Sequence, residues 1–260
     1  MTWRVVQASS VGTSHIENGE VCQDECLAGT FCAPDGEKYF LGLVSDGAGS
    51  ASHGRFGAEV ACEKGRDVIE QWVRKEVALS RLTLETVTSW VVAIRQHICQ
   101  AAEAEGLTPR DFACTLLGAV VGTKAAAFFQ VGDGAIVIRD GDGFHPVFWP
   151  DAGEYANMTH FVTDEDALVH LRRKIWLSSL ESSLPDEVAM FSDGLQRLAL
   201  VYESRTAYKP FFEPMFGTLR KADPAACDML SDQLARFLGN PKVNERTDDD
   251  KTLVLATRRD

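Results

Sequence analysis

Residues 40–57 read Phe-Leu-Gly-Leu-Val-Ser-Asp-Gly-Ala-Gly-Ser-Ala-Ser-His-Gly-Arg-Phe-Gly. The first six residues are mostly apolar, and an apolar run of this length that ends in turn residues is typical of a buried strand. The run ends at Asp46-Gly47, so a carboxylate stands where the chain leaves the sheet, and the glycine lets the backbone approach another group closely. One Asp-Gly alone indicates no more than a turn. Its meaning depends on whether the rest of the chain repeats the arrangement.

The arrangement does recur. Phe191-Ser192-Asp193-Gly194 is a near copy, and further aspartates stand beside apolar runs at Asp24, Asp133 and Asp249. If these strands meet at one end of a sheet, their carboxylates gather there, and clustered carboxylates repel one another. A hard divalent cation relieves this repulsion, and sites made only of oxygen favour Mg²⁺ or Mn²⁺. Two such ions would polarise a phosphoryl oxygen and activate a water between them.

The remaining pattern predicts one α+β domain over residues 1–260. Strands are expected at 3–8, 27–32, 40–45, 112–121, 125–131, 135–139, 143–148, 187–192 and 252–256, with a further strand at 175–177. Helices are expected at 57–79, 82–104, 195–203, 208–219 and 224–238.

Three regions carry more specific expectations. The helices at 57–79 and 82–104 are long and amphipathic, so we expect them to pack as an antiparallel pair against a sheet. The four closely spaced strands in 112–148 should form an antiparallel meander. Residues 9–25 read as a loop, and residues 150–183 read as an irregular, flap-like insertion with a possible part in substrate choice.

Composition narrows the function. The chain has 260 residues, 45% of them hydrophobic, and a net charge of −12, which argues against nucleic acid as a partner because phosphate binding relies on Lys and Arg. There is no polybasic patch for acidic lipid and no apolar run long enough to cross a membrane. The seven cysteines are odd in number and follow no signal peptide, which favours reduced thiols in the cytoplasm.

In these motifs, taken in order, the chain resembles the type 2C protein phosphatases, a family of metal-dependent serine/threonine phosphatases, in their compact bacterial form. The matching pieces are Ser14-His15, Cys22-Gln23-Asp24, Val44-Ser45-Asp46-Gly47, Ala113-Cys114-Thr115-Leu116-Leu117, Val131-Gly132-Asp133-Gly134, Phe191-Ser192-Asp193-Gly194 and Asp249-Asp250-Lys251-Thr252. The resemblance implies a four-layer α/β-β/α sandwich, in which two antiparallel sheets are flanked by helices, with a binuclear metal centre at one end.

The resemblance also implies roles for single residues. Asp46 matches the carboxylate that bridges the two metals, and Gly47 matches the residue whose carbonyl binds one of them. Asp193 and Asp249 match the remaining direct ligands, so Asp46, Asp193 and Asp249 are the expected catalytic set. The last motif of the family usually reads Asp-Asn, whereas this chain has Asp249-Asp250. Asp249 keeps the family's spacing to the final strand, and Asp250 is the possible substitute.

Two more acidic residues and one histidine complete the expected site. Asp24 matches a residue that holds metal-bound water, and Asp133 matches one linked to a third, weaker metal site, although a simple hairpin turn competes with that reading. Many relatives grip the substrate phosphate with an arginine in the first motif, and here His15 is the nearest counterpart. Many also have a histidine after Asp-Gly that protonates the leaving group, but this chain has Ala48, with His53 five residues on.

The resulting expectation is hydrolysis of phosphoserine and phosphothreonine on proteins by a metal-activated water, with two Mg²⁺ or Mn²⁺ ions and a third at Asp133. The substrate would be a product of a serine/threonine kinase, and the enzyme would be a monomer. A second hypothesis is a phosphoprotein-binding regulatory module with weak or no activity, and a third is a phosphatase for small molecules. Retention of Asp46, Asp193 and Asp249 favours the active enzyme over the binding module.

Overall fold

The computed structural model describes residues 2–76, 78–141, 143–150, 159–178 and 184–259. Two five-stranded antiparallel sheets form its centre. The first sheet has the order β1 (Thr2–Ser10), β12 (Lys251–Arg259), β9 (Glu187–Phe191), β6 (Ala135–Asp140) and β7 (Gly143–Pro146). The second has the order β2 (Asp24–Cys32), β3 (Lys38–Asp46), β4 (Leu116–Val121), β5 (Ala125–Val131) and β8 (Arg172–Leu177). A short pair joins β10 (Leu200–Val201) to β11 (Thr206–Ala207).

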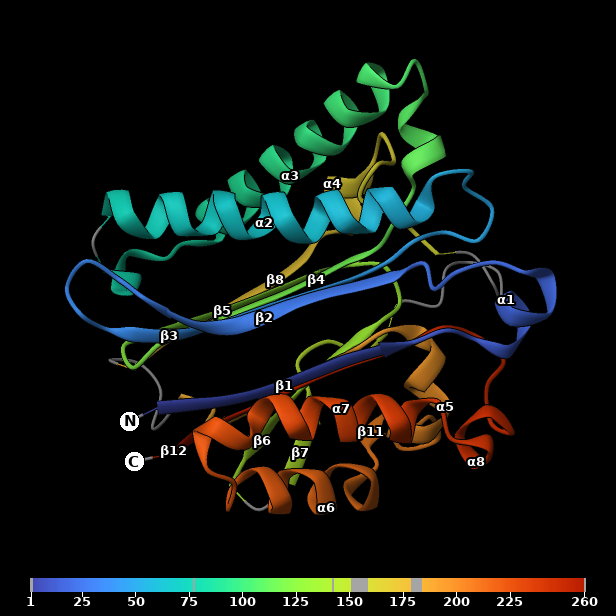
Figure 1. The fold of residues 1–260 in the computed structure, drawn as a ribbon. Coiled ribbons are helices and arrows are strands. Elements are labelled where there is room, and N and C mark those ends of the chain that lie inside the picture. The colour runs from blue at the N-terminus through green and yellow to red at the C-terminus, as the bar shows by residue number, and fades with distance from the viewer. Residues whose placement is uncertain (1, 77, 142, 151–158, 179–183, 260) are drawn as a thin grey trace.

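Helices cover the outer face of each sheet (Figure 1). The α-helices are α1 (Thr13–Asn18), α2 (Gly54–Glu76), α3 (Leu84–Ala104), α4 (Ala167–His170), α5 (Gln196–Ala199), α6 (Lys209–Leu219), α7 (Cys227–Leu238) and α8 (Pro241–Asn244). Short 3₁₀ turns are η1 (Leu79–Arg81), η2 (Pro109–Phe112), η3 (Asp193–Leu195) and η4 (Pro224–Ala226). With α2 and α3 on one sheet and α6 and α7 on the other, the four-layer α/β-β/α sandwich predicted from the sequence is confirmed.

The alternation of side chains along β3 explains the layers. Successive residues of a strand point to opposite faces, so one strand can contribute to two cores. Leu41 and Leu43 pack in the core beneath α2 and α3, whereas Phe40 and Val44 pack in the core between the two sheets. Because both faces of this sheet are covered, its central strands are mostly apolar on both sides, as the 40–45 run is.

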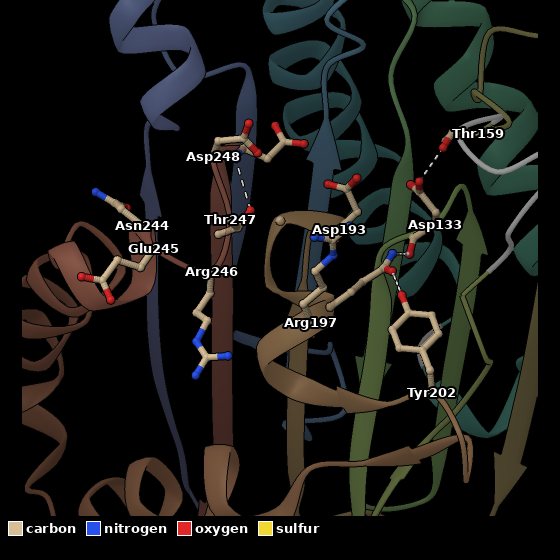
Figure 2. A pocket seen from close by; sticks show the side chains of 13 residues that line it. Asp133, Thr159, Asp193, Arg197, Tyr202, Asn244, Glu245, Arg246, Thr247 and Asp248 are labelled. Atoms are coloured by element: carbon tan, nitrogen blue, oxygen red, sulfur yellow. Dashed lines mark hydrogen bonds between the residues drawn. The ribbon is translucent and has the colours of Figure 1, made fainter.

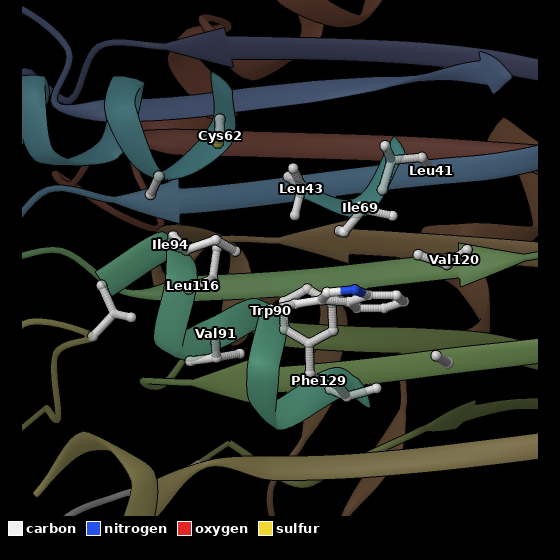
Figure 3. Packing of buried hydrophobic residues seen from close by; sticks show 14 of the residues in the cluster. Leu41, Leu43, Cys62, Ile69, Trp90, Val91, Ile94, Leu116, Val120 and Phe129 are labelled. Atoms are coloured by element: carbon white, nitrogen blue, oxygen red, sulfur yellow. The ribbon is translucent and has the colours of Figure 1, made fainter. Parts of the chain in front are cut away.

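The long helices form the predicted pair. Figure 3 shows Trp90, Val91 and Ile94 of α3 over strand residues of the second sheet, in a cluster that also includes Ile69 of α2. Trp72 of α2 meets the edge of Trp90, with 5.4 Å between ring centroids. Aromatic pairs in this arrangement contribute about 0.5–1.5 kcal/mol of stabilisation beyond that from the burial of their surface. These contacts fix α2, which follows directly from the turn after Asp46.

The predicted meander over 112–148 is wrong. Strands β4 and β5 pair in the second sheet, but β6 and β7 belong to the first sheet, where β6 pairs with β9. The chain crosses between the sheets at Gly132-Asp133-Gly134. Gly132 has φ +107°, and a Cβ on Gly134 would lie 2.8 Å from the Phe191 carbonyl oxygen. The sequence shows four strands and tight turns, but not that one turn changes sheet.

Two smaller expectations also change, and a third is confirmed in part. Residues 9–25 contain α1 and the start of β2, so they are not simply a loop. The helix expected over 195–203 is only the short α5 before β10 begins. Within the expected flap-like insertion 150–183, the strand predicted at 175–177 is confirmed as part of β8, which pairs with β5, whereas 151–158 and 179–183 lie outside the described residues.

A buried carboxylate ties the first sheet to α6. The Glu187 side chain is fully buried, and Arg220 contacts it twice at 2.7 Å, with Arg139 3.3 Å away and Arg259 also in contact. Thr257 donates a hydrogen bond of 3.1 Å to the same carboxylate. Burial alone would raise the pKa of Glu187, but hydrogen bonds from Arg220 and the neighbouring positive charges hold it below its ordinary value.

We therefore expect Glu187→Gln to lower the free energy of unfolding at neutral pH by about 3–5 kcal/mol, because it removes a fully buried charge that is the shared partner of three half-buried guanidinium groups. Urea unfolding measures this. Glu213→Gln is the matched control, since Glu213 also pairs with Arg220 but is 38% exposed, and it should cost less than about 1 kcal/mol. The difference between wild type and Glu187→Gln should narrow as the pH falls below about 4.3. Equal losses in the two variants would contradict this role for Glu187.

Candidate active site

Strand register brings the acidic motifs to one end of the sandwich. On neighbouring strands of the second sheet, Asp24 lies directly opposite Asp46. In the first sheet, Phe191 pairs with both Leu253 and Ala135. The carboxylates just outside these strand ends are Asp133, Asp193 and Asp249. In Figure 1 this end carries α1, α5 and α8, and the two chain termini lie at the opposite end.

Thr115 fixes the backbone at Asp46. The Asp46 amide donates to Thr115 Oγ1 at 3.0 Å, and the Thr115 amide donates to the Asp46 carbonyl at 2.8 Å. Ser45, which is fully buried, donates its hydroxyl to the Thr115 carbonyl at 2.6 Å. From the sequence, Thr115 reads as ordinary strand packing. The structure instead makes it the residue that sets where the Asp46 carboxylate leaves the sheet.

Gly47 sits where no side chain fits. A Cβ on this residue would lie 2.4 Å from the carbonyl carbon of Gly54, at the start of α2. The Gly47 amide donates to the Gln23 carbonyl at 3.2 Å. In the orientation that satisfies its hydrogen bonding, the Gln23 side-chain amide donates back to the Gly47 carbonyl at 3.1 Å. Only glycine allows α2 to begin this close to the strand end.

Asp24 is buried and held on one side only. Its side chain is 5% exposed, and the Ser192 hydroxyl donates to Oδ2 at 2.6 Å. Ser192 in turn accepts from the Thr252 amide at 3.0 Å, so the second Ser-Asp-Gly motif orients the first acidic residue. No donor among the described residues reaches Asp24 Oδ1. A buried carboxylate oxygen without a partner is costly, which favours a cation or water beside it.

Three of the aspartates predicted as ligands, Asp133, Asp193 and Asp249, line one pocket of about 740 Å³ (Figure 2). Asp193 begins the 3₁₀ turn η3, and Gly194 behind it would place a Cβ 2.0 Å from the Asp250 carbonyl oxygen. Oδ1 of Asp193 also lacks a donor among the described residues. Asp46 is not a lining residue, but the charge of Asp193 is among the causes that raise its pKa.

Asp133 is held by its neighbours at the crossing between the sheets. The Thr159 hydroxyl donates to Asp133 Oδ2, and Gln196 Nε2 donates to the Asp133 carbonyl at 2.5 Å. Gln196 also accepts from the Tyr202 hydroxyl (Figure 2). Asp133 therefore faces the pocket and is more than a hairpin turn. Its link to a third metal stays a proposal.

Asp249 and Asp250 point in different directions. Asp249 lines the pocket. Asp250 is 3% exposed, and its two oxygens accept from the amides of Gly12 and Gln23, each at 2.6 Å. Because both oxygens are engaged in holding residues 12–23, Asp250 is not placed to substitute for Asp249 as a metal ligand.

Two histidines considered from the sequence lie elsewhere. Nδ1 of His15 is 3.0 Å from Asp250 Oδ2, and Nε2 is 3.7 Å from Glu20 Oε2. Both ring nitrogens of His15 therefore face carboxylates, and its expected role in binding phosphate stays a prediction. His53 stacks on Phe112, with 5.5 Å between ring centroids, and is not among the pocket-lining residues.

The aspartates at this end of the sandwich repel one another electrostatically. We call them the acidic cluster: Asp24, Asp46, Asp133, Asp193 and Asp249. Burial, followed by the charges of Asp24, Asp193, Asp249 and Asp133, raises the pKa of Asp46 well above its ordinary value. Burial, followed by the charges of Asp133, Asp249 and Asp24, raises the pKa of Asp193 to about 8, and burial raises the pKa of Asp24 to about 7. Neighbouring negative charges disfavour ionisation of a carboxyl group, because like charges interact strongly where water is scarce.

This donor set fits a hard divalent cation. It offers carboxylate oxygens that are unpartnered and repel one another. Among the described residues, no three Asp, Glu, His or Cys side chains converge as a finished metal cage. Mg²⁺ does not require one, since it keeps several waters and is often held by only one or two carboxylates.

Solved structures of bacterial serine/threonine phosphatases share this architecture. The crystal structure of a bacterial serine phosphatase matches with a TM-score of 0.64 at 14% identity, covering 98% of this chain and 97% of that chain. The catalytic domain of the serine/threonine phosphatase PstP, in complex with two manganese ions, matches with a TM-score of 0.61 at 16% identity, covering 99% of each chain. At these identities the likeness establishes the fold.

Sequence comparison establishes the family. The model of the family "Protein phosphatase 2C" matches residues 11–239. Serine/threonine-protein phosphatase 3 of Escherichia coli (strain K12) is 42% identical over 257 residues, which cover 98% of this chain and 98% of the relative. The chain belongs to the protein phosphatase 2C family, and the predicted enzyme class, a protein serine/threonine phosphatase, is confirmed.

Stability of the metal-free protein should fall as the pH rises. The raised pKa values of Asp24 and Asp193 mean that the folded state holds protons that the unfolded state releases near pH 3.8. Folding is therefore penalised progressively from about pH 4 to about pH 8. We expect the melting temperature in EDTA to decrease across this window, and Mn²⁺ to raise it more at pH 8 than at pH 5. If Mn²⁺ raised the melting temperature equally at pH 5 and pH 8, repulsion among the ionised carboxylates would not be the cause of the lost stability.

Substitution of the adjacent residues Asp249 and Asp250 should affect different properties: metal binding for Asp249 and stability for Asp250. Asp249→Asn should weaken Mn²⁺ binding at least 10-fold by calorimetry, and it should not lower the stability of the metal-free protein, because it removes a charge that repels the other carboxylates. Asp250→Asn should instead destabilise the fold by about 1–3 kcal/mol, because an amide cannot accept from both backbone donors. Chemical denaturation of the metal-free protein measures this second effect. A weaker metal affinity in Asp250→Asn than in Asp249→Asn would reverse the assignment.

Proposed function

We propose that this phosphatase hydrolyses phosphoserine and phosphothreonine on proteins at a centre of two Mg²⁺ or Mn²⁺ ions, with a third, weaker ion at Asp133. One observation carries the proposal: Asp46, Asp193 and Asp249 come from three separate strand ends to one strained acidic cluster. The manganese complex of PstP, which has the same fold, supports the choice of cation.

Each residue of the cluster has a proposed task. Asp46, Asp193 and Asp249 hold the cations together with the Gly47 carbonyl, and Asp24 orients water through its free Oδ1. The bound cations would supply an activated water and stabilise the charge of the phosphoryl group during in-line attack. Thr115, Ser45 and Ser192 keep Asp46 and Asp24 in place and touch no substrate. Because Ala48 replaces a histidine and His53 lies elsewhere, we propose that water protonates the leaving oxygen.

The alternatives predict different behaviour. A phosphoprotein-binding module would have no use for a cluster whose mutual repulsion destabilises the fold, so the cluster favours turnover over binding alone. A phosphatase for small molecules would act on sugar phosphates at least as well as on phosphopeptides. The E. coli relative, named as a serine/threonine-protein phosphatase, supports a protein substrate.

The cellular compartment, the oligomeric state and the opposing kinase are also proposals. All seven cysteines are free thiols, which supports a reducing compartment, and we place the enzyme in the cytoplasm as a monomer that opposes a serine/threonine kinase. Among the described residues, none of the helices is both long enough and apolar enough for a membrane span.

The test is turnover of p-nitrophenyl phosphate and of a phosphothreonine peptide, with and without Mn²⁺. Wild type should act only with the metal, and Asp46→Asn should lower kcat/KM at least 100-fold and weaken Mn²⁺ binding. Asp248→Asn is the control, because Asp248 is exposed beside the site and has no assigned ligand role. Folded wild-type protein that stays inactive in saturating Mn²⁺ would refute the proposal.

A further inference from the structure

The pocket in front of the cluster lacks a partner for the substrate phosphate in the expected place. The first-motif arginine of many relatives is absent, and His15 lies against Asp250. The pocket is lined by five carboxylates: Asp133, Asp193, Glu245, Asp248 and Asp249. A phosphate dianion entering there needs positive charge beyond that of the metals. Among the described lining residues, only Arg197 and Arg246 carry it.

Local geometry places Arg197 beside a proposed metal ligand. It follows Asp193 by four residues, and the chain between them runs through η3 into α5. In helical backbone, residues four apart share a face with about 5–6 Å between their Cβ atoms. In Figure 2, Arg197 and Asp193 are neighbours on the same wall of the pocket.

A second observation agrees with this placement. The pKa of Tyr202 is raised by burial and by the charges of Asp133 and Asp193, and Arg197 opposes that rise. The guanidinium therefore lies within electrostatic range of a residue that also senses both aspartates. Arg197 is exposed, and no ion pair or side-chain hydrogen bond engages it among the described residues.

Arg246 provides a comparison within the same pocket. It is also exposed, and it stands three residues before Asp249. It lies beyond the end of α8, in the segment leading to β12, so no helical turn aligns it with a metal ligand. The charge of Arg246 adds to the positive potential in the pocket. Unlike Arg197, however, Arg246 is not placed beside a proposed metal ligand by a helical turn.

We propose that Arg197 binds the phosphoryl group of the substrate, in place of the first-motif arginine that this chain lacks. The inference rests on the proposed function and names a residue that holds its substrate. A guanidinium offers paired donors that match two phosphoryl oxygens, and its charge persists at every working pH. A short helical turn then presents two groups to one substrate: a metal ligand at Asp193 and a phosphate ligand one turn later.

The experiment compares Arg197→Ala, Arg197→Lys and Arg246→Ala. Arg236→Ala is the remote control, since Arg236 is an exposed residue of α7 that does not line the pocket. Three quantities are measured in saturating Mn²⁺: kcat and KM for p-nitrophenyl phosphate, the same constants for a phosphothreonine peptide, and the calorimetric affinity for inorganic phosphate. Calorimetry of Mn²⁺ itself shows whether the metal site is intact.

We expect Arg197→Ala to weaken phosphate affinity and to raise KM for both substrates by about 10- to 100-fold, the loss typical of a hydrogen bond to a charged group. Arg197→Lys should recover part of the loss because it keeps the charge but not the paired donors. Arg246→Ala should lose less, Arg236→Ala should match wild type, and Mn²⁺ affinity should not weaken in any variant.

Phosphate affinity in Arg197→Ala that equals wild type, or a loss no larger than that of Arg246→Ala, would overturn the proposal. A weakened Mn²⁺ affinity in Arg197→Ala would also overturn it, because the residue would then be supporting the metal site. If wild type turns over neither substrate in Mn²⁺, the proposed function fails, and phosphate calorimetry still decides the role of Arg197.

Discussion

Repulsion among buried carboxylates is the constraint on which this structure depends. The charges of Asp24 and Asp193 raise the pKa of Asp46, and Asp24 faces Asp46 on the neighbouring strand. A flexible chain would separate them. The two sheets prevent this, because each carboxylate stands at or beside the end of a strand that is hydrogen-bonded into a sheet. The free energy of apolar burial in the sandwich therefore opposes the repulsion at its end, and a cation can relieve that repulsion.

Neutral hydrogen bonds make the arrangement rigid. Ser192 and Thr115 bind carboxylate or backbone at the site, and both are almost fully buried. Their hydroxyls add no charge, so they position acidic groups without neutralising them. An arginine in the same place would pair with a carboxylate and remove its attraction for a metal. The contrast with Glu187 is instructive, since that carboxylate is surrounded by guanidinium groups and serves the fold.

Two positions at which the sequence departs from the expected pattern, His15 and Asp250, contact each other in the structure. Asp250 stands where the family usually has asparagine, and His15 is the nearest counterpart of a phosphate-binding arginine. In the structure these two residues lie 3.0 Å apart, and Asp250 holds residues 12–23 through two backbone amides. Together they form a structural contact between the first and last motifs. The positive charge that a phosphate needs is then left to other residues of the pocket.

The sequence by itself determined the strands that end in Asp-Gly, the two long helices and the order of the acidic motifs, because these follow from local periodicity and turn chemistry. It also indicated the family, and with it the sandwich. It could not show that the chain changes sheets at Gly132-Asp133-Gly134, because a turn reads the same whichever strand comes next. It favoured Asp249 over Asp250 as the ligand by spacing alone, but it could not show what Asp250 contacts or what holds Asp24. Those outcomes depend on contacts between residues far apart in the chain, such as Ser192 with Asp24, and only the packing of one sheet on the other brings such residues together.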